Sequence, residues 1–388
     1  MENFSFISPT KMYFGKNAET NLSHALKEYK KVLVVYGTGS IKKNGIYDKV
    51  IEELKKSKVE YFELSGVRAN PCISKVIEGL EIARKEHVDI VLAIGGGSVI
   101  DSAKSICVGY YYDGNPFDFN LHKVAPTKAL PLGVVLTLSA SGSELSDSCV
   151  VMDDDTLIKK GFNSDIVRPT FAIMNPEFTY SVNKHQTGCG IVDIISHSLE
   201  RYFTNSENND VCDILALAVI KETIRAGKVV INNPNDYNAR ADLMLLGSLS
   251  HNGLTSLGKT KQMPIHQMEH ALSAYDIGIA HGAGLSVLIP LWMGASYKED
   301  QAKFAKFGKE IFGLSGSEEE CAKQGIKMLK DFFVSIGMPV TLKEINLEEK
   351  DIVKVVDMMT QNGKIIVGQK SIKPLTKEEI VVLLHTIL

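Results

Sequence analysis

The sequence lacks a cysteine motif, although it contains six cysteines. They are scattered between positions 72 and 321 without a C-x-x-C pair. Disulfide-rich secreted domains and structural zinc sites both need closely spaced cysteines. Both are therefore disfavoured, and we expect these cysteines to be reduced and mostly structural.

A strong net charge and a long hydrophobic run are also missing. The formal net charge is −3, which gives no electrostatic basis for binding nucleic acid or an anionic membrane surface. The N-terminal stretch MENFSFISPTKMYFG lacks the basic and apolar segments of a signal peptide. The most apolar late stretch, AGLSVLIPLWMGA, is too short to span a bilayer and contains Pro290. We expect a cytoplasmic protein that has neither a nucleic acid nor a membrane as a partner.

No internal repeat or low-complexity linker divides the 388 residues, a length sufficient for two domains with separate cores. The spacing of apolar residues along the chain nevertheless changes near residue 183. Before it, short β-branched runs alternate with amphipathic segments, which predicts a parallel sheet covered by helices on both faces. After it, long amphipathic stretches carry apolar residues at intervals of three and four. We predict an α/β domain over residues 1–183 and a helical domain over residues 184–388.

The predicted elements follow from these patterns. The expected strands lie within 31–40, 59–66, 88–98, 130–144 and 171–178. The expected helices lie within 45–58, 74–87, 99–111, 208–232, 236–254, 317–337 and 348–363.

A carboxylate and an imidazole lie four residues apart in GCGIVDIISHSLERYF, residues 188–203. Asp193 and His197 are one helical turn apart and share a face, so that both can touch one object. A single pair of this kind is also explained by two polar side chains that satisfy each other at a helix surface.

A second cluster follows about seventy residues later, in IHQMEHALSAYDIGIAHGAGL. His266 and His270 are again four apart, and His281 follows a loop-like break. Gln267 stands where the helix of a zinc protease needs its glutamate base, which disfavours peptide hydrolysis. Core or interfacial histidines remain an alternative for this cluster alone.

Together the two clusters suggest a metal site. Asp193, His197, His266 and His281 would supply one oxygen and three imidazole nitrogens. Such a set suits Fe(II), Zn(II) or a similar first-row divalent ion with one position left open for substrate.

Two glycine-rich turns between a strand and a helix are candidates for phosphate binding. GTGSIKKNG contains Gly37, Gly39 and Gly45 but misses the G-x-G-x-x-G spacing, because Lys42 occupies the sixth place. GGGSVIDSAK, residues 95–104, also lies outside that pattern. Three consecutive glycines after a buried strand are rarely needed by a purely structural turn, and we expect phosphate contact there.

GGGSVIDSAK, the Asp193/His197 pair and HQMEHALSAYDIGIAHG together resemble the iron-dependent, or group III, alcohol dehydrogenases. The resemblance extends along essentially the whole chain, from KMYFGK through LTLSASGSE to the helical half. Within the family, the sequence is most similar to the NADPH-dependent butanol dehydrogenases of fermenting bacteria. The implied fold is dehydroquinate synthase-like, with an α/β nucleotide-binding domain and an all-α metal-binding domain.

The resemblance implies a role for many individual residues. The metal ligands of the family fall on Asp193, His197, His266 and His281, although the interval from His270 to His281 is one residue longer than in several relatives. Catalytic roles fall on His270 and on Asp101, which would lie near the nicotinamide. The cofactor contacts fall on Gly37, Thr38, Gly39, Ser40, Lys43, Asn70, Gly96, Gly97, Ser98, Asp101, Thr137, Leu138, Ser141 and Lys159, with Lys160 as the alternative to Lys159.

The implied function is a metal-dependent, NADP(H)-linked alcohol dehydrogenase and aldehyde reductase for small primary alcohols and aldehydes such as butanol and butanal. A divalent ion, Fe(II) in preference to Zn(II), would act as a Lewis acid while hydride moves to or from the nicotinamide. His270 would relay a proton, or else orient a neighbouring group. We expect a homo-oligomer, a dimer or larger. The alternatives are a glycerol or diol dehydrogenase, a sugar-phosphate cyclase, or a catalytically silent nucleotide- or metal-sensing protein.

The preference for NADP(H) is predicted from the first glycine turn. NAD-specific members of the family commonly carry an aspartate where this sequence has Thr38. An aspartate there would repel the 2′-phosphate of NADP(H). Ser40 can hydrogen-bond that phosphate, and Lys42 or Lys43 can neutralise it. The alternative is a plain glycine turn with solvated lysines.

Overall fold

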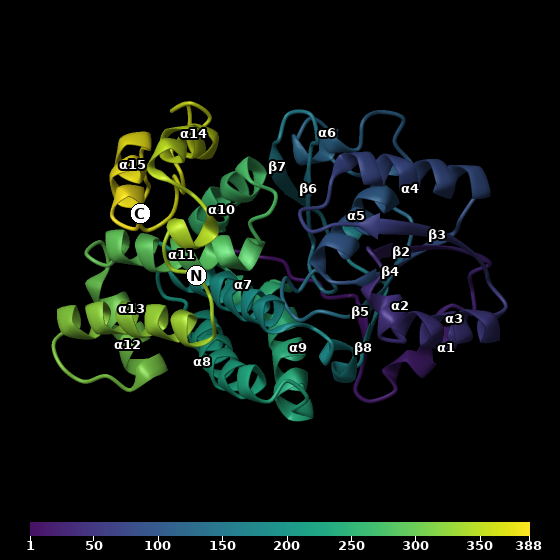
Figure 1. Ribbon diagram of the computed structural model, residues 1–388, viewed down its shortest axis with the longest axis horizontal. Helices are drawn as coiled ribbons and strands as arrows, with labels where there is room; N and C mark the ends of the chain where they lie inside the picture. The colour runs from purple at the N-terminus through teal and green to yellow at the C-terminus, as the bar shows by residue number, and fades with distance from the viewer. The chain divides into compact units, whose positions relative to one another are not determined.

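The computed structural model describes all 388 residues, and the chain folds into two compact units of different secondary structure (Figure 1). The α/β unit contains Ile7–Val182 and Asn235–Ser248. The helical unit contains Met1–Phe6, Asn183–Pro234 and Leu249–Leu388. The chain thus enters the α/β unit only after its first six residues, and it returns there for one short segment.

A six-stranded, fully parallel sheet forms the centre of the α/β unit. Its strands, in spatial order, are β1 (Lys11–Phe14), β8 (Phe171–Met174), β5 (Leu132–Leu136), β4 (Ile90–Gly95), β2 (Lys31–Gly37) and β3 (Glu60–Val67). Every residue of β4 and β5 is buried, as the continuous apolar runs predicted. The predicted parallel sheet is confirmed.

Helices cover both faces of this sheet because its strands alternate their side chains. Val32 and Val34 of β2 belong to one core with α1 and α3, whereas Leu33 and Val35 belong to a second core with α4 and α5. The helices of the unit are α1 (Leu22–Ala25), α2 (Ser40–Lys43), α3 (Ile46–Ser57), α4 (Ile73–Glu86), α5 (Gly97–Gly109) and α6 (Phe117–Asn120). Short 3-10 helices lie at η1 (Ala18–Asn21), η2 (Asp165–Val167) and η3 (Pro176–Thr179).

Three strands have no counterpart among the predicted elements. One is the edge strand β1, and the others form an antiparallel hairpin of β6 (Ser148–Met152) and β7 (Lys159–Asn163). Asn120 holds the hairpin, since its side-chain amide donates to the carbonyl oxygens of Cys149 and Lys160 at 3.2 and 2.8 Å. These strands are short, and β7 contains more polar than apolar residues, so that alternation alone does not reveal them.

The remaining chain is helical, as predicted. Its helices are α7 (Lys184–Tyr202), α8 (Asp210–Asn232), α9 (Tyr237–His251), α10 (Pro264–Tyr275), α11 (His281–Ser296), α12 (Gln301–Phe312), α13 (Glu318–Ser335), α14 (Glu349–Thr360) and α15 (Lys377–His385), with 3-10 turns at η4 (Leu254–Ser256) and η5 (Lys343–Ile345). Most of α9 belongs to the α/β unit, which ends at Ser248. None of the helices combines the length and the apolar character needed to cross a membrane.

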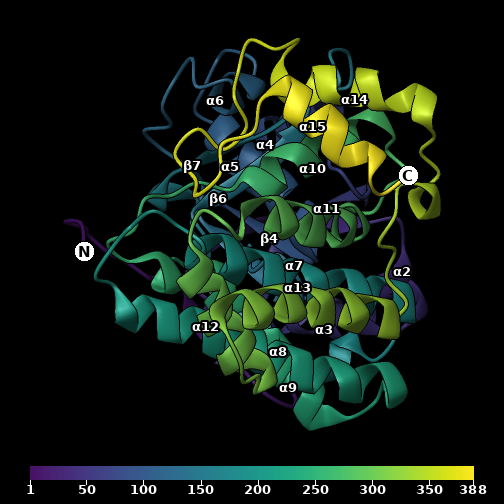
Figure 2. The ribbon, with the colours of Figure 1, turned by 90° about the vertical axis from the view of Figure 1, so that its left-hand side faces the viewer.

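Helix α11 lies inside the helical unit, with α7, α10 and α13 packed around it. Figure 2 shows α10, α11 and α7 one above the other. Almost all its residues from Gly282 to Met293 are buried, which explains its apolar sequence without a membrane. The same three helices, α7, α10 and α11, carry the two polar clusters found in the sequence.

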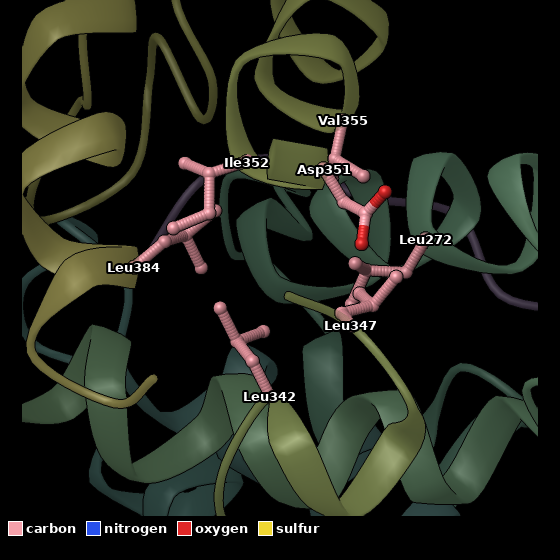
Figure 3. A pocket seen from close by; sticks show the side chains of 7 residues that line it. All are labelled: Leu272, Leu342, Leu347, Asp351, Ile352, Val355 and Leu384. Carbon is pink, nitrogen blue, oxygen red and sulfur yellow. The ribbon is translucent and has the colours of Figure 1, made fainter. Parts of the chain in front are cut away.

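A small apolar hollow lies elsewhere in the helical unit, among α10, α14 and α15 (Figure 3). Leu272, Leu347 and Leu384 point toward one another there. Asp351 is its one charged group, and its carboxylate accepts a 2.6 Å hydrogen bond from the Tyr275 hydroxyl. The hollow contains no set of metal-binding or nucleophilic side chains, and we interpret it as imperfect packing of the core.

Candidate active site

Helix α7 presents three acidic or imidazole side chains along one buried face. Asn183 caps the helix by accepting a 2.8 Å hydrogen bond from the Gln186 amide. Asp193, His197 and Glu200 follow at positions i, i+4 and i+7, and each is at most 4% exposed. The first two of these residues are predicted ligands, whereas Glu200 was not predicted from the sequence.

Two further histidines reach Asp193 from α10 and α11. The Asp193 Oδ1 atom lies 3.6 Å from His197 Nδ1 and 3.5 Å from His266 Nε2. It also lies 3.7 Å from Nε2 of His281, the first residue of α11. The structure therefore brings the four predicted ligands together around one carboxylate oxygen, within a single unit of the protein.

Several atoms that face this point have no hydrogen-bond partner although they are fully buried. They are Asp193 Oδ1, His197 Nδ1 and His266 Nε2. A buried polar atom left unpaired costs about 1–3 kcal/mol, so that a cluster of them calls for a further partner. Ligand atoms of Asp193, His266 and His281 lie within 4.8 Å of one another. One oxygen with three imidazoles suits a borderline divalent cation, and the residues present therefore fit a metal ion.

Two buried glutamates hold the outer nitrogens of two of these histidines. His266 Nδ1 hydrogen-bonds to Glu200 Oε2, and His281 Nδ1 hydrogen-bonds to Glu269 Oε2. Glu269 belongs to α10 and is completely buried. Neither carboxylate was predicted from the sequence. The available signals were the i+7 place of Glu200 after Asp193 and the i+3 place of Glu269 after His266.

Glycines allow α11 to approach closely enough to deliver His281. A Cβ atom on Gly282 would lie 2.3 Å from the carbonyl oxygen and 2.4 Å from Cα of Cys189, one turn before Asp193 on α7. A Cβ atom on Gly284 would lie 2.9 Å from the Cγ atom of Glu269. The two glycines of the run HGAG therefore let the α11 backbone come into close contact with Cys189 of α7 and Glu269 of α10.

The histidines differ in their electrostatic environment. Burial lowers the pKa of His197 well below its usual range, and the nearby imidazoles of His251 and His266 act in the same direction. Burial also acts to lower the pKa of His266, but the carboxylates of Glu200 and Asp193 outweigh it and raise the pKa to about 9. An incoming cation would therefore displace a proton from His266, because only the deprotonated ring nitrogen can bind metal.

Two more histidines border the cluster. The ring of His251, at the end of α9, lies edge to face with that of His197 at 4.0 Å between the centroids, a contact that was not predicted from the sequence. His270 is half-buried, and its ring centroid lies 5.8 Å from that of His281. His270 thus lies next to the four proposed ligands, beside the one among them that is most exposed to solvent.

The glycine-rich turn after β4 lies against the segment after β5. The Thr137 amide donates to the Gly95 carbonyl at 3.1 Å. A Cβ atom on Gly96 would lie 3.0 Å from Leu138 Cβ, and one on Gly97 would lie 2.4 Å from Ser141 Oγ. Adjacent parallel strands end at the same edge of a sheet, which is where open α/β folds bind ligands. The predicted cofactor contacts of these two segments thus lie side by side, and Ser98 follows in the first turn of α5.

Asp101 ties the same region together. Its Oδ1 accepts a 2.6 Å hydrogen bond from the Ser143 hydroxyl, and its Oδ2 accepts a 3.0 Å bond from the Val150 amide. Burial raises the pKa of this carboxyl group, which Lys104 opposes. Both oxygens are therefore engaged within the protein, where they hold the loop and the β6–β7 hairpin on α5.

The remaining predicted contacts form two smaller groups. Lys159 Nζ donates to the side-chain oxygen of Asn70 at 2.9 Å, which joins two of the predicted residues and distinguishes Lys159 from its neighbour Lys160. The first glycine turn, with Gly37, Thr38, Gly39, Ser40 and Lys43, follows β2 and leads into α2. Gly39 has φ +115°, a conformation that favours glycine.

Lys42 is occupied by partners that the sequence did not reveal. Its Nζ lies 3.7 Å from Glu63 Oε2 and over the rings of Tyr36 and Tyr47, at 5.0 and 4.5 Å from their centroids. Glu63 in turn accepts hydrogen bonds from both tyrosine hydroxyls, at 2.5 and 2.6 Å. Of the two lysines in the turn, Lys43 is therefore the one left exposed without an ion pair.

Comparison with known proteins decides the family. A sequence model described as iron-containing alcohol dehydrogenase matches residues 9–176, and a second, described as the C-terminal part of the Fe-containing alcohol dehydrogenase family, matches residues 187–388. The chain belongs to this family. The resemblance to the iron-dependent alcohol dehydrogenases is confirmed, and so is the dehydroquinate synthase-like fold. Among butanol dehydrogenases, the NADPH-dependent enzyme of Clostridium saccharobutylicum is 26% identical over 92% of this chain, less than the NADH-dependent enzymes described next.

Three relatives show how this iron-containing alcohol dehydrogenase compares with others. It is 40% identical to NADH-dependent butanol dehydrogenase A of Clostridium acetobutylicum over 98% of both chains. The crystal structure of an NADH-dependent butanol dehydrogenase A from Thermotoga maritima has a TM-score of 0.95 at 38% identity and covers 100% of this chain and 99% of that chain. The NADPH-dependent aldehyde reductase YqhD of Escherichia coli is 29% identical over 95% of this chain and 96% of its own. The chain is thus an alcohol dehydrogenase or aldehyde reductase, and its family implies a nicotinamide cofactor and a metal.

Proposed function

We propose that this iron-containing alcohol dehydrogenase interconverts small primary alcohols and aldehydes, such as butanol and butanal, with a single divalent ion held by Asp193, His197, His266 and His281. The convergence of these side chains on one buried point, with unpaired atoms facing it, carries the proposal. An ion bound there supplies Lewis-acid polarisation of the substrate oxygen. The donor set suits Fe(II), with Zn(II) as the alternative.

The α/β unit supplies the nicotinamide site in this proposal. Gly96, Gly97 and Ser98 present backbone amides at the start of α5, where a pyrophosphate is favoured. Thr137, Leu138 and Ser141 line the neighbouring turn, and the Lys159–Asn70 pair contributes polar groups. We assign Asp101 the task of holding these segments in place near the nicotinamide, since both its oxygens bind the loop and the hairpin.

His270 moves the proton in this proposal. Its half-buried imidazole lies beside His281 and can pass a proton between the substrate oxygen and solvent through its two ring nitrogens. A role in orienting a neighbouring group is the alternative. The two are separated by whether a variant at this position keeps its metal.

For the cofactor we propose NADP(H). Thr38 places no carboxylate in the first glycine turn, and exposed Ser40 and Lys43 can contact a 2′-phosphate. Lys42 is engaged by Glu63 and is assigned no contact. NADH is the alternative, favoured by the names of the two butanol dehydrogenases above.

Steady-state kinetics on protein of measured metal content test the proposal. Protein loaded anaerobically with Fe(II) should oxidise NADPH in the presence of butanal. The kcat/KM should be higher with NADPH than with NADH, and higher for butanal than for glycerol-derived aldehydes. No turnover of any aldehyde with either cofactor, in fully loaded protein, would contradict it. Light scattering of the same sample tests the expected homo-oligomer.

A further inference from the structure

The three histidines of the cluster are held in two different ways. His266 and His281 each bind a buried carboxylate through Nδ1, from Glu200 and Glu269. His197 has no carboxylate of this kind. Its ring stacks on His266, with 4.6 Å between centroids and 22° between planes, and packs against the edge of His251.

A carboxylate at Nδ1 decides which ring nitrogen is bare. A neutral imidazole carries its proton on one nitrogen only, and a carboxylate that accepts from Nδ1–H leaves Nε2 with its lone pair free. The Nε2 atoms are the ones that face Asp193, at 3.5 Å for His266 and 3.7 Å for His281. The negative charge also makes that lone pair a stronger donor to a cation.

Glu200 does a second task at the same time. Its Oε1 accepts a 2.6 Å hydrogen bond from the Ile265 amide and a longer one, 3.4 Å, from the His266 amide. These amides belong to the first turn of α10, whose N–H groups have no partner within the helix. One carboxylate from α7 therefore fixes both the start of α10 and the ring that this start carries.

Glu269 has a narrower task. It lies on α10 and reaches the first residue of α11, a contact made possible by the missing side chain of Gly284. It thus connects the orientation of His281 to the helix that carries His266. The two glutamates together link the three helices that supply the four proposed ligands.

We propose that Glu200 and Glu269 are positioning residues that fix the tautomer and orientation of His266 and His281 and thereby set the metal affinity of the site. The proposal rests on the metal site assigned above and extends it to two residues that do not touch the ion. It requires that neutralising either carboxylate weakens metal binding even though the four ligands remain.

Co(II) binding to the metal-free protein tests this inference without any turnover. Glu200→Gln and Glu269→Gln keep the side-chain shape but remove the charge. Each should weaken Co(II) binding about 10- to 100-fold, the range typical for partners of ligating histidines. Each should also shift the visible absorption of bound Co(II), which reports ligand geometry, and reduce the rise in Tm that Co(II) produces.

A matched control is Glu144→Gln. Glu144 is as buried as Glu200, and it binds the Ser248 hydroxyl at 2.5 Å, with no histidine. This variant should leave the Co(II) affinity unchanged. Glu200→Gln should lower the Tm of the metal-free protein more than Glu269→Gln does, because only Glu200 caps a helix.

The outcomes separate the inference from the function on which it rests. If the unmodified protein binds no stoichiometric Co(II), or if His266→Ala binds it as tightly, the metal site itself is wrong. If His266→Ala loses Co(II) while both glutamine variants keep the affinity and absorption of the unmodified protein, the site stands and the positioning role is wrong. If a glutamine variant does not fold, Glu200→Asp or Glu269→Asp takes its place. The shortened carboxylate of these variants should keep part of the Co(II) affinity of the unmodified protein.

Discussion

The proposed metal site and the glycine-rich turn after β4 are built in opposite ways. The proposed site depends on side chains, since the four predicted ligands from α7, α10 and α11 converge on a buried point and two glutamates bind the outer nitrogens of His266 and His281. The turn after β4 depends on missing side chains, since Gly96 and Gly97 leave room for Leu138 and Ser141. We therefore expect the proposed metal site to lose function when side-chain atoms are deleted. We expect the turn to lose function when side-chain atoms are added.

The largest effect is expected when a proposed ligand is deleted. His281→Ala or Asp193→Ala should lose the metal, and turnover should fall about a thousand-fold or more, because Lewis-acid catalysis contributes several kcal/mol. Elemental analysis and steady-state kinetics on the same sample measure both. His185→Ala, an exposed histidine on the same helix, is the control and should change neither. Full metal content together with full turnover in His281→Ala would remove it from the site.

Next in size is the effect of His270→Ala, which should keep the metal and lower kcat about 100-fold, a typical loss for a general acid or base. This outcome would sharpen the comparison, because it separates chemistry from metal binding within one cluster. The readouts are metal content and the kcat of butanal reduction. A variant that loses metal would show instead that His270 supports the structure of the site.

Adding one methyl group to the turn after β4 should have a moderate effect confined to the cofactor. In Gly97→Ala the new Cβ would lie 2.4 Å from Ser141 Oγ, which must move. Overpacking of this kind costs ~1–3 kcal/mol, and we expect the Kd for the nicotinamide to rise about ten-fold at unchanged metal content. Quenching of cofactor fluorescence measures that Kd. Gly294→Ala, where no atom lies within 4 Å of the new Cβ, is the matched control, and equal effects in the two variants would count against the close approach.

The smallest effect concerns the turn after β2. Thr38→Asp would bring a carboxylate near the proposed 2′-phosphate, and like charges about 4 Å apart in water repel by ~1 kcal/mol, or about five-fold in affinity. The kcat/KM for NADPH should fall by that factor while the value for NADH changes little. If the unmodified enzyme already uses NADH as well as NADPH, the turn does not discriminate between them.

The predicted residues differ in how far the sequence could reveal them. Asp193 and His197 were accessible because a helix repeats every 3.6 residues, and an acid with an imidazole at i+4 stands out in an apolar run. Glu200 and Glu269 were not, since an acidic residue on a helix is usually solvated, and only the packing of three helices shows that these two are buried beside histidines. The same holds for Glu63, whose pairing with Lys42 depends on the neighbouring position of β3 and β2.

The fold was predictable where one segment carries the whole signal. The fully buried strands β4 and β5 and the long helices of the second half are examples. The strand β1 was not, because its four residues become a strand only by pairing with β8, about 160 residues away along the chain. The β6–β7 hairpin likewise depends on Asn120 and Asp101, which lie outside it.

The position of the first six residues has a consequence for the order in which the protein can mature during synthesis. The Met1 amino group donates to the Glu207 carbonyl at 3.1 Å, and the Glu2 amide donates to the Gly258 carbonyl at 3.0 Å. These two residues thus lie more than 200 residues before their partners along the chain. Strand β1 likewise pairs with β8, which lies about 160 residues later in the chain. Contacts so distant along the chain form late, so that the N-terminal segment joins its unit only after most of the chain has emerged. A nascent chain that ends at residue 182 therefore contains every strand of the parallel sheet. It still lacks Glu207 and Gly258, which bind the N-terminal segment.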